Sequence, residues 1–258
     1  LHAIKENNDV HLVLIGDPAQ LPSIGPSGFF QQIAGSKIEN LPVAKLTTIY
    51  RSSGGGDYAK NRLTDFANSI REGKYIAKHS SCITEDNLTK DNVIKIADLL
   101  KNQGHQLIDM LFLTPQKGGE FGTNKLNQWL RPIFLDKLTP IENLELCIGD
   151  PVVAIKNDYA IPTGREGYLR KIRHEKREQD VYNGTRGRIT SWEPDANTIM
   201  IEYITPDGTV ELPYTREEIL SWIDVGYALT VHKAQGSEAK VVVFCKPGKL
   251  KVKRNMIY

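Results

Sequence analysis

The sequence contains little cysteine, no long hydrophobic run and almost no net charge. Its three cysteines, Cys82, Cys147 and Cys245, lie far apart and lack the spacing of metal ligands. Isolated thiols of this kind are typical of a reduced, cytoplasmic protein, and we expect no metal site. No apolar run approaches the roughly 20 residues of a membrane span, so we expect no membrane partner. A net charge of +2 excludes a uniformly basic chain, so any contact with nucleic acid must come from local patches.

Three short apolar runs predict the buried parallel strands of an α/β fold. They are Val10–Ile15, Leu107–Leu113 and Lys240–Phe244. The first runs into Gly16–Gly28 and the second into Thr114–Gly119, and both of these segments carry polar side chains. Loops beyond the carboxyl ends of parallel strands are where α/β proteins bind ligands, so we expect binding residues in both segments.

Apolar residues at helical spacing predict several helices in the α/β part. The clearest is Tyr58–Glu72, an amphipathic pattern that ends near Gly73. Thr123 is expected to be the N-cap of its helix. Further helices are expected over Phe29–Ile33, Asp91–Leu100, Thr123–Leu130 and Thr215–Trp222, and an alternating strand over Val43–Tyr50.

Between about Gly149 and Ile223 the pattern changes to short β-rich runs separated by turn residues. Such runs favour a small antiparallel barrel that interrupts the α/β domain. Within this part, Gly164–Glu178 is densely charged with a basic excess. It is either a solvated hairpin or disordered loop, or an arm that touches a nucleic-acid backbone. The expected strands are Asp150–Ile155, Thr185–Trp192, Thr198–Tyr203 and Gly208–Pro213.

Three polar segments have two interpretations each when taken alone. Gly226–Glu238, GYALTVHKAQGSE, either grips an anion or a sugar hydroxyl, or is a polar surface loop with nothing bound. Asp17 and Gln20 either reach a phosphate or a water, or belong to a Pro/Gly-rich connection. Arg51 is either an ordinary surface charge or a phosphate-binding guanidinium.

Five segments stand in order along the chain: GDPAQLPSIGPSG, LTTIYRS, LFLTPQKGGEFGTNKLN, GDPVVAIKNDY…VYNGTRGRI and GYALTVHKAQGSE. Together they closely resemble superfamily 1 DNA helicases of the RecD-like, 5′-to-3′ group. The helicase parts of conjugative relaxases share much of this pattern. The resemblance covers nearly the whole chain, and five ordered segments make it specific.

The resemblance implies an α/β fold with RecA-like domains of the P-loop NTPase type. Residues 1–53 would be the tail of a first RecA-like domain. Residues 54–148 and 224–258 would form the second, and residues 149–223 an inserted small SH3-like β-barrel. The chain opens with Leu1 instead of an initiator Met, and it stops in an apolar run without a cap. We therefore expect a fragment of a longer protein.

The resemblance also implies roles for individual residues. Gln20 and Arg51 would be catalytic, the first by sensing the γ-phosphate and the second by stabilising its charge. The nucleotide-binding residues would be Asp17, Gln20, Arg51, Gln235, Gly236 and Glu238, with Glu238 near the ribose. The residues that contact DNA would be Thr114, Lys117, Asn183, Thr230, His232 and Lys233.

The intact parent is expected to use ATP and Mg²⁺, to translocate on single-stranded DNA and to unwind duplex. No segment matches GxxxxGK[ST], so we expect the fragment to bind neither cofactor and to be inactive alone. DNA repair, recombination and conjugation all fit the resemblance, as does fusion to or complex with a nuclease or relaxase component. The alternative is a non-catalytic nucleic-acid-binding module with a β-barrel.

Overall fold

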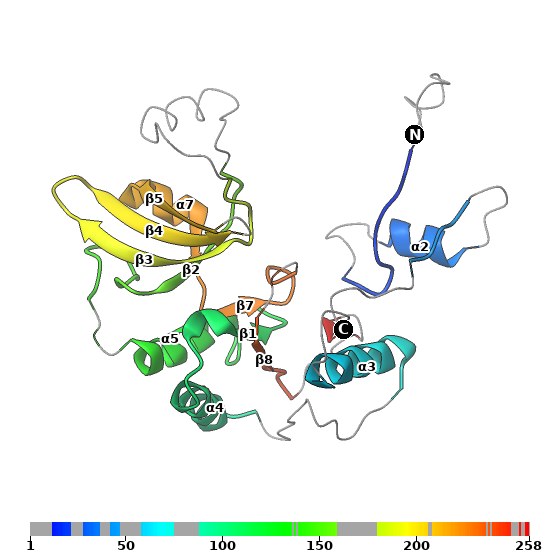
Figure 1. Ribbon diagram of the computed structural model, residues 1–258. Coiled ribbons are helices and arrows are strands. Elements are labelled where there is room, and N and C mark those ends of the chain that lie inside the picture. The colour runs from blue at the N-terminus through cyan, green and yellow to red at the C-terminus, as the bar shows by residue number, and fades with distance from the viewer. Residues whose placement is uncertain are drawn as a thin grey trace. The chain divides into compact units, whose positions relative to one another are not determined.

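The computed structural model describes residues 12–21, 28–36, 42–46, 58–74, 88–135, 137, 139–158, 180–205, 208–235, 237, 239–248, 253 and 256–257. The chain divides into two compact units, one of residues 1–85 with 251–258 and one of residues 86–250 (Figure 1). No helix in the part that the structure describes is long and apolar enough to cross a membrane.

The first unit contains the helices α2 (Phe29–Gly35) and α3 (Tyr58–Glu72). The bounds of α3 are those predicted, and the chain leaves it through Gly73, whose φ of +76° favours glycine. The predicted strand at residues 10–15 is wrong where it can be tested. Residues 12–15 form no strand, and their side chains are 44–90% exposed, because no strand among the described residues lies beside them.

The second predicted strand of this unit, over residues 43–50, is also absent where it is described. Residues 43–46 form no strand, and Leu46 is 95% exposed. Residues 47–50 lie outside the described residues, as does Arg51. Alternating apolar residues predict extended backbone, but a strand also needs a neighbour that offers hydrogen bonds.

The α/β part of the second unit is built on a three-stranded parallel sheet in the order β7-β1-β8. The strands are β1 (Met110–Thr114), β7 (Ala228–Thr230) and β8 (Val241–Phe244). A 3-10 turn, η1 (Leu107–Asp109), takes the first residues of the run predicted as one strand. β8 is an edge strand with Val242 55% exposed, so its predicted full burial is wrong.

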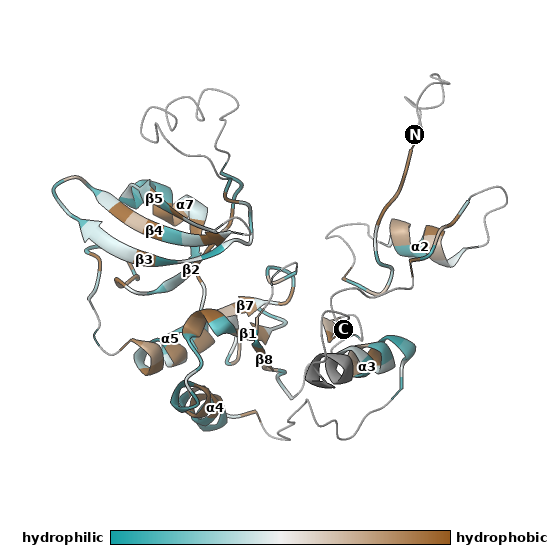
Figure 2. Ribbon diagram, viewed as in Figure 1, coloured by the Kyte–Doolittle hydropathy of each residue, from teal (hydrophilic) through white to brown (hydrophobic). Residues whose placement is uncertain are grey.

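Two helices of this unit, α4 (Lys90–Asn102) and α5 (Thr123–Phe134), share a core with the parallel sheet. Figure 2 shows hydrophobic and hydrophilic residues on both helices, as expected where one face is buried. The shared core contains the buried side chains of Val93, Ala97, Leu126 and Leu130 with Met110 and Phe112.

The start of α5 differs from the prediction. Its N-cap is Gly122, which has no side chain to offer, and Thr123 is the first helical residue. The reason is steric, because a Cβ on Gly122 would overlap the carbonyl oxygens of Lys117 and Gly118. The loop before α5 therefore folds tightly back on itself and needs glycine at this position.

The β-rich part of the second unit is a five-stranded antiparallel sheet in the order β5-β4-β3-β2-β6. Helix α7 (Arg216–Trp222) follows β5, and Thr215 and Glu218 form its capping box. Buried Ile189, Ile201 and Tyr203 belong to its core. The strands are β2 (Pro151–Ala154), β3 (Arg186–Glu193), β4 (Thr198–Thr205), β5 (Gly208–Tyr214) and β6 (Ile223–Val225).

This sheet is open in the part of the chain that the structure describes. β5 and β6 are its two edges, so the described residues form no closed barrel. Closure would require hydrogen bonds between the edge strands. Instead, β6 is three residues long and pairs with β2, and the chain then continues through Gly226 and Tyr227 into β7 of the parallel sheet. The unit is thus a mixed α/β structure with one parallel and one antiparallel sheet.

Candidate nucleic-acid interface

The carboxyl ends of β1 and β7 bring together two residues predicted to contact DNA. Thr114 and Thr230 are register partners in the parallel pair. Beyond β7 the backbone turns at once, because the amide of Val231 donates to the Thr114 carbonyl and the amide of Ala234 donates to the Thr230 carbonyl. This turn carries residues 231–235, the middle of the polar segment noted in the sequence.

The turn has a buried side and an exposed side. Val231 and Ala234 are buried, and Ala234 packs with Leu111, Val153 and Leu229 between the two sheets. His232 and Gln235 are exposed, and Lys233 is partly so. Because the apolar side chains hold the turn against the core, the polar side chains are directed away from it.

Lys233 and Lys117, from opposite ends of this unit's sequence, meet at one carboxylate. The Lys233 Nζ lies 2.6 Å from Asp224 Oδ2, and the Lys117 Nζ lies 3.8 Å from the same oxygen. The other oxygen, Oδ1, accepts a 3.1 Å hydrogen bond from the amide of Val225. Asp224 was missed in the sequence. It stands two residues before the polar segment, and only the pairing of β6 with β2 brings it to the lysines.

A turn of the antiparallel sheet adjoins the same place. Gly184 has a φ of +93°, and a Cβ on it would lie 3.7 Å from the carbonyl oxygen of Lys233. The preceding Asn183 is exposed, and its amide donates to Asn157 Oδ1 at 2.8 Å. Predicted DNA contacts from both sheets therefore converge. The strand-end cluster comprises Thr114, Lys117, Asn183, Asp224, Thr230 and Lys233.

Thr114 differs from the other members of the strand-end cluster because it is fully buried. Its hydroxyl donates a 2.7 Å hydrogen bond to the carbonyl of Phe121. The side chain thereby holds the loop of residues 115–122, which carries Lys117. Its contribution to the surface is indirect.

The predicted nucleotide-binding residues are described only in part. Asp17 accepts hydrogen bonds from the amide of Ala19 at 2.9 Å and from Gln20 Nε2 at 3.5 Å, so it orders a turn that ends at Gln20. Both belong to the first unit. Arg51, Gly236 and Glu238 lie outside the described residues, as does the charged insert 164–178. Within the described ranges, no three His, Cys, Asp or Glu side chains are grouped to hold a metal ion.

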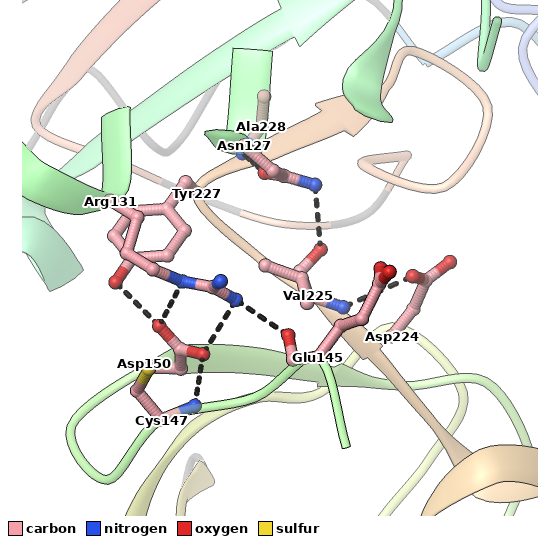
Figure 3. Close-up of polar contacts among 9 residues, drawn as sticks. All are labelled: Asn127, Arg131, Glu145, Cys147, Asp150, Asp224, Val225, Tyr227 and Ala228. Atoms are coloured by element: carbon pink, nitrogen blue, oxygen red, sulfur yellow. Dashed lines mark hydrogen bonds and ion pairs between the residues drawn. The ribbon is translucent and has the colours of Figure 1, made fainter. Parts of the chain in front are cut away.

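A buried ion pair fixes the entry to β7 (Figure 3). Arg131 Nε and Nη2 donate to the two oxygens of Asp150 at 2.9 and 2.8 Å. Asp150 is fully buried and also accepts hydrogen bonds from the Tyr227 hydroxyl and the Cys147 amide, each at 2.7 Å. Burial and the charge of Asp150 raise the pKa of Tyr227, so the phenol stays a donor. Burial opposes the charge of Arg131, but Asp150 outweighs it and raises the pKa of the guanidinium.

Asn127 of α5 holds the same segment from its other side (Figure 3). Its Nδ2 donates to the Val225 carbonyl at 3.4 Å, and its Oδ1 accepts from the Ala228 amide at 2.7 Å. The link between β6 and β7 is therefore fixed to α5 through the backbone carbonyl that precedes it and the backbone amide that follows it. Sequence patterns gave no indication of Asn127, because its partners are about a hundred residues away.

Arg186 joins the two sheets of the unit. Its guanidinium donates to the carbonyls of Leu107, Ile108 and Met110 at 3.3, 3.2 and 2.8 Å. Burial lowers the pKa of Arg186. β3 is thus held to the amino end of β1, whereas the strand-end cluster lies at the carboxyl end of β1.

Family models match both ends of the chain, and a known protein matches nearly its whole length. The family model for an AAA domain matches residues 1–89, and the model for a UvrD-like helicase C-terminal domain matches residues 225–258. The ATP-dependent RecD2 DNA helicase of Deinococcus radiodurans is 27% identical over 251 residues, which are 96% of this chain and 30% of the relative. The RecBCD enzyme subunit RecD of Buchnera aphidicola is 29% identical over 178 residues, 66% of this chain and 24% of the relative. These matches support a RecD-like relationship to the helicases of superfamily 1.

The resemblance drawn from the five sequence segments is therefore confirmed. The RecD-like chain spans less than a third of the length of these curated relatives. Of the predicted DNA contacts, Thr230, His232 and Lys233 fall inside the UvrD-like helicase match. Asp17 and Gln20 fall inside the AAA match.

Proposed function

We propose that this chain is part of an ATP-dependent DNA helicase that translocates on single-stranded DNA and unwinds duplex. The observation that carries the proposal is the strand-end cluster. It gathers Lys117, Lys233 and the Asn183 turn at the carboxyl ends of the parallel strands. Ligands of open α/β sheets bind at this edge. The proposed ligand, DNA, is inferred from the matched relative that is named a DNA helicase.

In this proposal the strand-end cluster binds the DNA backbone. The ammonium groups of Lys117 and Lys233 pair with phosphates, which positions the strand without reading its sequence. His232 is exposed beside them and adds a further donor. Thr114 and Thr230 hold the two loops that carry these lysines in place through hydrogen bonds at the strand ends. The antiparallel sheet presents Asn183 to the same DNA strand. We propose that this sheet belongs to an SH3-like barrel.

The nucleotide would bind at the first unit in the intact protein. We propose that Gln20 senses the γ-phosphate, that Asp17 orders its turn, and that Arg51 stabilises the transferred charge. ATP and Mg²⁺ would require motifs absent from this sequence, so the chain alone is expected to hold neither. We also propose that Gln235, Gly236 and Glu238 bind nucleotide in the intact protein. Repair or recombination, with a nuclease or relaxase component, is the proposed setting.

The test uses the full-length gene product. Its ATPase rate is measured with and without single-stranded DNA, and again for Arg51→Ala. We expect DNA to stimulate hydrolysis, and Arg51→Ala to abolish most of it while DNA affinity is kept. A folded protein with no DNA-stimulated hydrolysis would contradict the helicase proposal. If it still bound DNA with a strong dependence on salt, the non-catalytic binding module would be the better description.

A further inference from the structure

We propose that Asp224 sets the DNA affinity of the strand-end cluster by competing with a DNA phosphate for Lys117 and Lys233. This inference rests on the proposed function, because it assumes that the two lysines bind DNA. The inference assigns to Asp224 the role of weakening DNA binding by the two lysines beside it. A helicase must release each phosphate as it moves, so a built-in competitor suits translocation.

The geometry holds the Asp224 carboxylate in place. The residue lies in the middle of β6, where its backbone pairs with Val153 of β2. Oδ1 accepts from the Val225 amide at 3.1 Å, which leaves Oδ2 facing Lys233 at 2.6 Å and Lys117 at 3.8 Å. The side chain cannot turn away without losing its backbone hydrogen bond. It therefore remains beside the lysines when another anion approaches.

The surface is open enough for a phosphate to arrive. The side chains of Asp224, Lys233 and Lys117 are 33%, 37% and 66% exposed. These three groups carry two positive charges and one negative charge. A phosphate that pairs with Lys233 must come close to Oδ2, and like charges at that distance repel. An ammonium group has three donors and can bind both anions, but the repulsion between them remains.

The test measures binding of a fluorescent oligothymidine by the 258-residue chain, over a series of salt concentrations. Asp224→Asn keeps the size of the side chain and the Oδ1 acceptor but removes the negative charge. We expect it to bind about twofold to fivefold more tightly at low salt. Its salt dependence should be steeper by up to about 0.7 in the log–log slope, so a fourfold rise in salt should reduce its advantage about 2.6-fold.

The matched control is Glu202→Gln. Glu202 also forms an ion pair, with Arg188 at 3.0 Å, and is also 33% exposed, but it lies on β4 outside the strand-end cluster. It removes the same charge from the chain. We expect its affinity to stay close to that of the parent, so that an effect of overall charge is separated from an effect at the cluster.

Further variants separate the failure of the inference from the failure of the proposed function. If Asp224→Asn binds no more tightly than the parent while Lys233→Ala weakens binding, the competition is disproved and the DNA interface stands. If Lys117→Ala and Lys233→Ala both bind like the parent, the interface itself is wrong and the inference falls with it. If Asp224→Asn does not fold, Asp224→Ser is the second variant, and the same tighter binding is expected of it. The proposal is supported if Asp224→Asn binds more tightly than the parent and if Lys233→Ala, added to Asp224→Asn, removes this gain.

Discussion

The Tyr227 hydroxyl and the Arg131 guanidinium bind the same buried carboxylate, that of Asp150, although one lies at the entry to β7 and the other on α5. The Asp150 side chain has no exposed surface, while that of Arg131 is 21% exposed. A buried carboxylate that loses its cation keeps its full desolvation cost. The entry to β7 therefore depends on this ion pair, and the strand-end cluster lies at the other end of the same strand.

Arg131→Ala is expected to lower the free energy of unfolding by about 3–5 kcal/mol, because Asp150 would remain buried without its cation. Urea denaturation followed by circular dichroism measures this. Arg188→Ala is the control, since Arg188 is 65% exposed in its pair with Glu202 and should cost less than about 1 kcal/mol. Equal losses for the two variants would show that burial does not matter here.

Asn127→Ala should destabilise the second unit and weaken DNA binding together. The amide of Ala228 would lose its acceptor, which costs about 1–3 kcal/mol when the group is buried. The end of β7 would then be less firmly fixed. Ser221→Ala, which removes an exposed side-chain hydrogen bond to the Glu218 carbonyl on α7, is the control for both measurements. DNA affinity unchanged in Asn127→Ala would argue against the importance of this link.

Gly122→Ala and Gly118→Ala should differ sharply, although they stand four positions apart in one loop. A Cβ on Gly122 would overlap the carbonyl oxygen of Gly118, whereas a Cβ on Gly118 meets no atom within 4 Å. We expect the first to cost at least about 1–3 kcal/mol of stability and the second to stay within about 0.5 kcal/mol. Thermal unfolding of both variants decides the matter, and similar melting temperatures would contradict the loop structure.

Alkaline conditions should destabilise the fold through Cys245. Burial raises the pKa of this thiol from 9.0 to about 12. Between those values the unfolded chain releases the proton while the folded chain keeps it, so stability falls as pH rises. One such group contributes a slope of about 1.4 kcal/mol per pH unit. Stability measured from pH 8 to 11 should fall less steeply in Cys245→Ala than in the parent, and parallel curves would refute the assignment.

The sequence predicted elements well where local pattern decides them. The spacing of Phe66, Ala67 and Ile70 gave α3 its bounds, and the β-rich runs gave β2 to β5 within a few residues. It failed where pairing decides. β6 and β7 are each three residues long and were not predicted, because a short strand is defined by its neighbours and not by its own pattern.

The same distinction holds for the strand-end cluster. Lys117 and Lys233 were identified from the segments that contain them, but Asp224 was not. Its importance comes from a contact between β6 and the two loops, which no local spacing reveals. Arg131, Asp150 and Asn127 were missed for the same reason, since each acts through partners distant in sequence.

The chain leaves the α/β part at β2 and returns to it from β6, and these two strands are direct partners, with Val152 opposite Val225. The chain therefore enters and leaves the antiparallel sheet through two strands that are neighbours in that sheet. Everything between these strands could be exchanged for a loop of a few residues without breaking the connection from α5 to β7. Such an arrangement allows the residues between β2 and β6 to be enlarged, shortened or replaced as one unit during evolution. The contacts of Arg186, which lies between β2 and β6, would then mark what a replacement must supply to keep the parallel sheet in order.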